Sequence, residues 1–185
     1  YLTKPIKNQQ FDGGLNIYCG TICFVLLFVY LLNRRIKLWD KVKNVIILVV
    51  IFASFNNQLL NYIWHGFHDQ YGIPNRFSFL FIFLLLAMCC EVLMKLQKKD
   101  ILSVMLGIAC GYAFLILATK KCTLEKETLL WTEIFITAYA VCMVGFTLTK
   151  GMWKRIISYV LLIVCLVETT INGIKGYDSN GYVDI

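Results

Sequence analysis

Long runs of apolar residues alternate with short polar segments along the chain. Six runs stand out, at residues 15–33, 44–64, 77–96, 101–118, 129–149 and 156–174. Each is close to the roughly 20 residues that an α-helix needs to cross about 30 Å of hydrocarbon. The pattern therefore predicts an all-α fold, a polytopic transmembrane helical bundle of about six spans within residues 15–174, with both chain ends on one side.

Composition supports a membrane protein over a soluble one. With 59% hydrophobic residues among 185 and a mean hydropathy of +0.69, the chain has more apolar surface than one soluble core could bury. Its net charge of +7 falls in short clusters between the runs, which indicates membrane topology and not nucleic-acid binding. Several cysteines lie inside apolar runs, where cysteine behaves as a small hydrophobic residue, so we expect neither disulfides nor a metal cluster from them: Cys23, Cys89, Cys90, Cys110, Cys142 and Cys165.

The distribution of basic residues predicts the orientation in the membrane. By the positive-inside rule the richer side is cytoplasmic, which places residues 1–14 and 175–185 outside. Trp39 and Trp153 then fall at inner ends of runs, and Trp64 and Trp131 at outer ends. Seven basic residues lie on the outer side, against eleven on the inner side. The eleven inner residues are Arg34, Arg35, Lys37, Lys41, Lys43, Lys95, Lys98, Lys99, Lys150, Lys154 and Arg155.

The segment WHGFHDQYGIPNRFS, residues 64–78, concentrates the polar chemistry of the chain, and we call it the central polar segment. Pro74 disfavours helix before it, so the segment should form an ordered re-entrant turn at the outer surface. Arg76 then stands at the start of the third helix, where free amides and a guanidinium together make a phosphate site. The alternative is an interfacial anchor that contacts lipid headgroups.

Three further side chains of this segment admit more than one chemistry. His65, His68 and Asp69 have a spacing that suits a divalent metal, but with only two histidines and Gly66 between them we expect no metal and no other cofactor. Asp69 is a candidate general base within reach of a sugar hydroxyl, or simply a solvated or capping carboxylate.

The second apolar run is polar in its last third. At 100° per residue, five side chains share one helix stripe about 100° wide: Ser54, Asn57, Gln58, Asn61 and His65. Amides facing lipid would be costly, so the stripe should face other helices as interhelical hydrogen bonds or line a wet cavity. We favour a cavity because the stripe converges on His65.

Two acids lie well inside the predicted spans. Glu91 is four residues before Lys95, which predicts an ion pair near the cytoplasmic end of the third run. Glu168 lies in the outer part of the sixth run, one turn before Asn172. It is either a lining residue of the same cavity or a hydrogen-bonded packing acid.

Three stretches closely resemble the bacterial YfhO family of multispan membrane proteins. They are FDGGLNIYCG, the stretch NYIWHGFHDQYGIPNRFSFLFIFLLL and the later VETTING. The most specific positions are Trp64, His65, Gly66, Phe67, Pro74, Arg76, Phe77 and Phe79. The chain, which opens on Tyr1, would be an excerpt of a longer protein, from the later transmembrane core to the start of an external domain.

The resemblance implies a GT-C type glycosyltransferase of the bacterial cytoplasmic membrane. Such an enzyme takes a sugar from an undecaprenyl-phosphate carrier and transfers it, on the outer face, to a cell-envelope polymer such as teichoic acid. The resemblance also implies that the general base is an aspartate of an external loop outside these residues. The predicted partners are thus the lipid bilayer, the polyprenyl-phosphate-linked sugar and the polymer acceptor.

We therefore expect one outward-facing substrate pocket. Its predicted lining residues are His65, His68, Asp69, Arg76, Asn57, Asn61 and Glu168. A transporter or flippase of lipid-linked sugars would need the polar stripe to continue to the cytoplasmic face, whereas residues 44–55 are mostly apolar. A non-catalytic membrane assembly partner is a third possibility.

Overall fold

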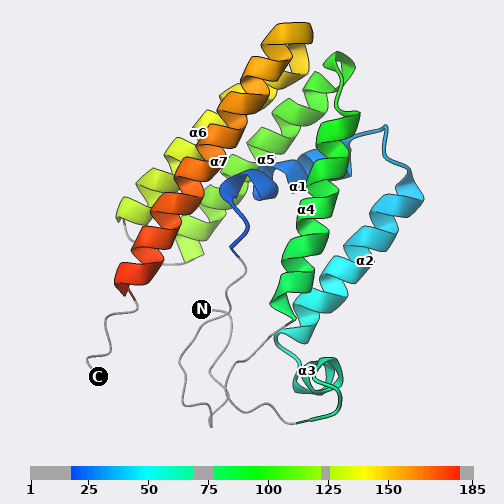
Figure 1. The fold of residues 1–185 in the computed structure, drawn as a ribbon. Helices are drawn as coiled ribbons and strands as arrows, with labels where there is room; N and C mark the ends of the chain where they lie inside the picture. The colour runs from blue at the N-terminus through cyan, green and yellow to red at the C-terminus, as the bar shows by residue number, and fades with distance from the viewer. Residues whose placement is uncertain (1–17, 69–76, 122–125, 180–185) are drawn as a thin grey trace. The chain divides into compact units, whose positions relative to one another are not determined.

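The fold is entirely α-helical in the part of the chain that the computed structural model describes, residues 18–68, 77–121 and 126–179. This confirms the predicted fold class (Figure 1). In chain order the elements are α1 (Thr21–Leu32), α2 (Leu38–Ser54), α3 (Gln58–Trp64), α4 (Ser78–Lys95), the short 3₁₀ turn η1 (Lys98–Asp100), α5 (Ile101–Lys121), α6 (Lys126–Leu148) and α7 (Gly151–Ser179).

Four of these helices are long and apolar enough to cross a membrane: α4, α5, α6 and α7. They stand where the last four apolar runs predicted spans. The first run differs, because α1 has only 12 residues and would cover about 18 Å at 1.5 Å per residue. The expected six spans thus reduce, within the described residues, to four helices of full length and the shorter apolar α1.

The second predicted span, residues 44–64, is not one continuous helix. α2 ends at Ser54, whose hydroxyl donates to the carbonyl of Val50 at 2.7 Å, and α3 begins only at Gln58. Asn57 has an extended backbone and caps α3, its side chain accepting from the Leu60 amide at 3.1 Å. Short polar side chains compete for backbone groups in this way, and here they interrupt the helix.

The chain divides into two compact units. The first unit contains α2, α3 and most of α4, within Ile36–Cys90. Its core consists of Ile51, Phe55 and Phe77, with three partly buried residues of α4 packed around them, Leu80, Phe81 and Leu84.

The second unit comprises Gly20–Arg35 together with the chain from Glu91 onward. In it α1 packs against α5 and α6, and α6 packs against both α5 and α7. The approach of α1 to α5 is close, because a Cβ at Gly107 would lie 2.5 Å from Val29 Cγ2 and 3.1 Å from the Val29 amide nitrogen. Gly107 and Gly111 are four residues apart, the small-residue spacing that lets membrane helices approach closely.

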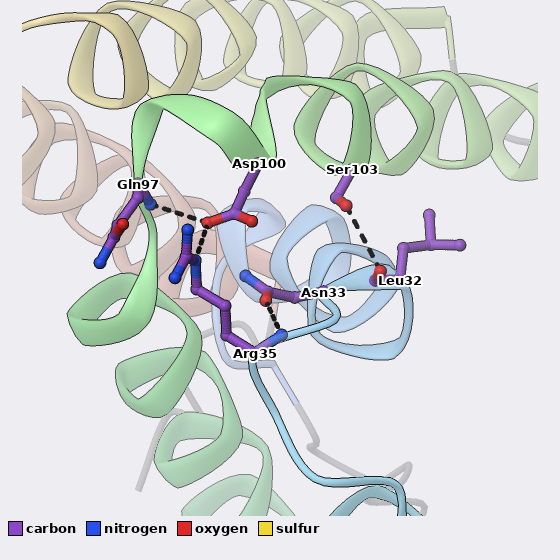
Figure 2. A network of polar contacts seen from close by, with 6 residues as sticks. All are labelled: Leu32, Asn33, Arg35, Gln97, Asp100 and Ser103. Atoms are coloured by element: carbon purple, nitrogen blue, oxygen red, sulfur yellow. Dashed lines mark hydrogen bonds and ion pairs between the residues drawn. The ribbon is translucent and has the colours of Figure 1, made fainter.

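A polar network joins the turn after α1 to the start of α5 within the second unit (Figure 2). Asn33 Oδ1 accepts from the Arg35 amide, and Arg35 Nε donates to Asp100 Oδ2, each at 2.8 Å. The Gln97 amide donates to the same carboxylate oxygen at 2.9 Å. Because Asp100 is buried, these two donors replace the water that its carboxylate loses.

Candidate functional site

The central polar segment begins with a defined helix end. After α3 stops at Trp64, Gly66 adopts a left-handed conformation with φ 68°. The Gly66 amide donates to the Ile63 carbonyl at 3.1 Å, and the Phe67 amide to the Tyr62 carbonyl at 3.0 Å. These two bonds and the edge contact of the Tyr62 and Phe67 rings, 5.9 Å between centroids, form a Schellman motif.

Phe67 carries backbone strain at the same turn. Its φ of 63° lies in the left-handed region, which costs a residue with a Cβ about 1–2 kcal/mol. Among the described residues it is the one non-glycine residue with positive φ. The turn therefore holds the backbone in a conformation that favours glycine on two consecutive residues, directly before the remainder of the central polar segment.

His65 is held through one of its two ring nitrogens. Its Nδ1 lies 2.7 Å from the carbonyl oxygen of Asn61. A carbonyl can only accept, so Nδ1 carries the proton and Nε2 of the neutral ring is an acceptor. That Nε2 is buried and has no hydrogen-bond partner among the described residues. An imidazole fixed in this way can accept a hydrogen bond from a hydroxyl group.

An aromatic cluster supports the His65 ring. Phe77 lies at its centre, stacked on Phe55 at 5.0 Å and on Trp64 at 5.5 Å between centroids. The His65 ring meets Phe77 edge-on at 5.8 Å. The indole Nε1 of Trp64 donates to the Ser54 hydroxyl at 3.0 Å, which joins the end of α3 to the end of α2. Phe77 thus contacts the His65 ring, and Phe77 is itself packed against Phe55 after α2 and Trp64 at the end of α3.

The predicted stripe of five polar side chains does not form. Ser54 is fully buried and is occupied by Val50 and Trp64, while the side chain of Asn57 caps α3. The uniform 100° step on which the stripe rested fails at the break between α2 and α3. Asn61 contributes its carbonyl oxygen to His65, and Gln58 begins α3.

The remaining predicted residues of the central polar segment are distributed as follows. His68 is exposed and directly follows Phe67, whose amide makes the second Schellman bond. Asp69 and Arg76 lie outside the described residues. In the described part of the chain, no group of three or more His, Cys, Asp or Glu side chains is placed to hold a metal ion.

Glu168 has a different setting, inside the second unit. It is buried, with 3% of its surface exposed, and its carboxylate joins three helices. Oε1 accepts from the Thr21 amide at 2.8 Å and from the Thr21 hydroxyl, while Oε2 accepts from the Tyr139 hydroxyl at 2.5 Å. Of the two interpretations left open by the sequence, these contacts support the hydrogen-bonded packing acid.

The carboxylate also caps α1 from a distance of 147 residues along the chain. Gly20, the residue before α1, has φ 88° and no side chain with which to cap the helix. A Cβ at Gly20 would lie 3.5 Å from Glu168 Oε2, so the backbone and the carboxylate are in close contact. An anion at a helix N-terminus is favoured by the free amides and the macrodipole.

The second intramembrane acid behaves as predicted. Lys95 Nζ lies 2.6 Å from Glu91 Oε1, which confirms the i,i+4 ion pair. The polar residues that sequence reasoning missed are Thr21 and Tyr139, the partners of Glu168. One signal was available for Thr21: Gly20, inside the first apolar run and directly before Thr21, has no side chain that could cap the first helical amides.

Comparisons with known proteins give one clear result. A family model described as bacterial membrane protein YfhO matches residues 6–183. Neither the curated proteins nor the solved structures contain a match. The family match covers nearly the whole chain, including all four long apolar helices and the turn that holds His65. This chain therefore belongs to the YfhO family of bacterial membrane proteins.

Proposed function

We propose that the chain is part of a multi-pass glycosyltransferase of the GT-C type in the bacterial cytoplasmic membrane. Such an enzyme transfers a sugar from an undecaprenyl-phosphate carrier to a cell-envelope polymer such as teichoic acid, on the outer face of the membrane. Family membership supports the proposal, through the function that the resemblance implied. The observation that ties it to this chain is His65, whose buried Nε2 has no partner in the described residues.

In this proposal the central polar segment binds the donor. The His65 Nε2 accepts a hydrogen bond from a sugar hydroxyl, and its ring is fixed for that purpose by Asn61 and Phe77. Arg76 binds the carrier phosphate, and His68 and Asp69 complete the polar surroundings of the sugar. Glu168 has the separate role of holding α1, α6 and α7 together.

The reaction is a displacement at the anomeric carbon. An acceptor hydroxyl forms a bond to that carbon while the bond to the phosphate oxygen of the carrier breaks. The hydroxyl proton passes to a general base, for which the family resemblance implies an aspartate outside these residues, and Asp69 is the candidate within them. Arg76 stabilises the negative charge that develops on the departing phosphate, most strongly where bulk water is excluded.

The test uses the full-length protein in membranes supplied with radiolabelled polyprenyl-phosphate glucose or polyprenyl-phosphate N-acetylglucosamine. We expect Arg76→Ala to lower transfer of label to the envelope polymer about 100-fold, as loss of a group that stabilises developing charge does. His65→Asn keeps a donor toward the Asn61 carbonyl and removes Nε2, so we expect a decrease of about tenfold. Arg34→Ala, on the predicted cytoplasmic side, should leave transfer unchanged.

The outcomes separate the site from the function. If both site variants transfer label at the rate of the unmodified protein and are expressed normally, the site assignment is wrong while the enzyme remains. If the unmodified protein moves the labelled lipid across the membrane without transferring the sugar, the transporter alternative replaces the enzyme. Absence of both activities with either donor contradicts the proposed function itself.

A further inference from the structure

An open hollow of about 690 Å³ lies in the second unit, where α7 begins. Glu168 lies in the later part of the same helix. Three parts of the chain form it: the connection from α4 into η1, the end of α6 and the start of α7. Contacts between α6 and η1 bring these parts together. The lining residues are Leu96, Gln97, Lys98, Lys99, Thr147, Thr149, Lys150, Gly151 and Lys154.

The charge of this hollow is of one sign. Four of its nine lining residues are lysines, and none is acidic. No described carboxylate forms an ion pair with Lys98, Lys99 or Lys150, and the ammonium of Lys154 lies 4.2 Å from the centre of the Phe146 ring. Asp100, which follows Lys98 and Lys99 in η1, is instead engaged by Arg35.

Three basic side chains outside the hollow behave differently. Lys95, Arg35 and Lys43 each have a carboxylate partner within 2.9 Å. The membrane topology requires lysines near the helix ends, but it does not require them to converge around one hollow. Four like charges around one open hollow repel one another, and a bound anion relieves that repulsion.

We propose that this lysine-lined hollow binds the headgroup of an anionic phospholipid. It lies at the ends of helices long enough to cross a membrane, which is where lipid phosphates are found. Met152 and Trp153, at the start of α7, are 69% and 64% exposed and are suited to the boundary between headgroups and acyl chains. The site is independent of the proposed transfer reaction and of the central polar segment.

The test measures lipid retention by the full-length protein. The protein is placed in nanodiscs of phosphatidylcholine and phosphatidylglycerol with identical acyl chains, and the lipids retained after extraction are counted by native mass spectrometry. We expect preferential retention of phosphatidylglycerol. Because one lysine near an anionic surface contributes a factor of about five, Lys98→Gln with Lys150→Gln should lower that retention about tenfold or more.

Two matched variants make the result specific. Arg34→Gln with Lys37→Gln removes the same charge from the same predicted membrane face without touching the hollow, and it should retain phosphatidylglycerol normally. Lys98→Arg with Lys150→Arg keeps the charge and should also retain it. An equal loss in the Arg34 and Lys37 variant would show a general surface-charge effect and overturn the proposal.

A second arm distinguishes lipid from free anion. Inorganic phosphate in large excess over the protein should displace little of the retained phosphatidylglycerol. Complete displacement would identify a site for free phosphate, and the lipid assignment would fail. Equal retention of phosphatidylcholine and phosphatidylglycerol by the unmodified protein would also overturn it, because the lysines would then confer no preference for anionic headgroups.

Discussion

Glu168 in the second unit and His65 in the first are both polar side chains inside largely apolar surroundings, but their partners differ. Both carboxylate oxygens of Glu168 accept from donors on other helices, Thr21 and Tyr139. His65 bonds one turn back on its own helix and leaves Nε2 without a partner in the described residues. A buried polar group with all its bonds made is part of the framework, whereas one with an unfilled acceptor is suited to a ligand.

The same contrast holds for the energetic consequences of substitution. Removing a buried acid that accepts several hydrogen bonds leaves several donors unsatisfied at once, so the free energy of unfolding should fall strongly. Removing the free nitrogen of His65 breaks no bond to the described protein, so stability should change little. Substitutions in the two units should therefore differ clearly in their unfolding midpoints.

The largest effect is expected from Glu168→Ala. The substitution leaves the Thr21 amide, the Thr21 hydroxyl and the Tyr139 hydroxyl without their acceptor, and it uncaps α1. Because each buried donor left without an acceptor costs about 1–3 kcal/mol, the loss is several kcal/mol. Thermal unfolding of the full-length protein in detergent should show a lower midpoint than for any other single substitution proposed, and lower yields in membranes should accompany it.

Two milder substitutions grade the effect at this position. Glu168→Gln keeps one oxygen acceptor, so its unfolding midpoint should lie between those of the unmodified protein and Glu168→Ala. Tyr139→Phe removes a single donor from the cluster and should cost about 1 kcal/mol. Equal unfolding midpoints for Glu168→Ala and Tyr139→Phe would contradict the assignment of Glu168 as the shared acceptor of α1 and α6.

An intermediate effect is expected at Asp100. Asp100→Ala removes the acceptor of the Arg35 guanidinium and of the Gln97 amide, so about 2–3 kcal/mol should be lost (Figure 2). The control is Asp40→Ala, which breaks the exposed pair with Lys43 at 2.9 Å and should cost less than about 1 kcal/mol. The two variants are compared by thermal unfolding. Equal decreases in their unfolding midpoints would mean that the buried hydrogen bonds of Asp100 stabilise the fold no more than the pair of Asp40 with Lys43 does.

The sequence was informative where one physical quantity dominated. The length of the apolar runs alone places α4, α5, α6 and α7, because each is an uninterrupted stretch with the length of a membrane span. The pair Glu91 and Lys95 was equally predictable, since i,i+4 neighbours on a helix must be close. Both features depend only on residues near one another in the chain.

The sequence was misleading where one residue type has two uses. Asn57 is compatible both with a polar helix stripe and with a helix cap, and periodicity favoured the wrong choice. The partners of Glu168 could not be predicted at all, because they depend on which helices pack together over 147 residues of sequence. Local patterns therefore predicted the helices, and long-range packing decided which polar groups are satisfied.

The smallest effect tests the turn that presents His65. Gly66 has φ 68°, and a Cβ added there would meet no atom within 4 Å beyond its chain neighbours, so Gly66→Ala adds strain without a clash and should cost about 1 kcal/mol. Gly173→Ala is the matched control, since its site is equally open but lies inside α7, where alanine is favoured over glycine by about 0.5–1 kcal/mol. The unfolding midpoints of the two variants should therefore move in opposite directions. If Gly66→Ala raises the midpoint as Gly173→Ala does, α3 does not end in the left-handed turn, and the fixed orientation of the His65 ring loses its structural basis.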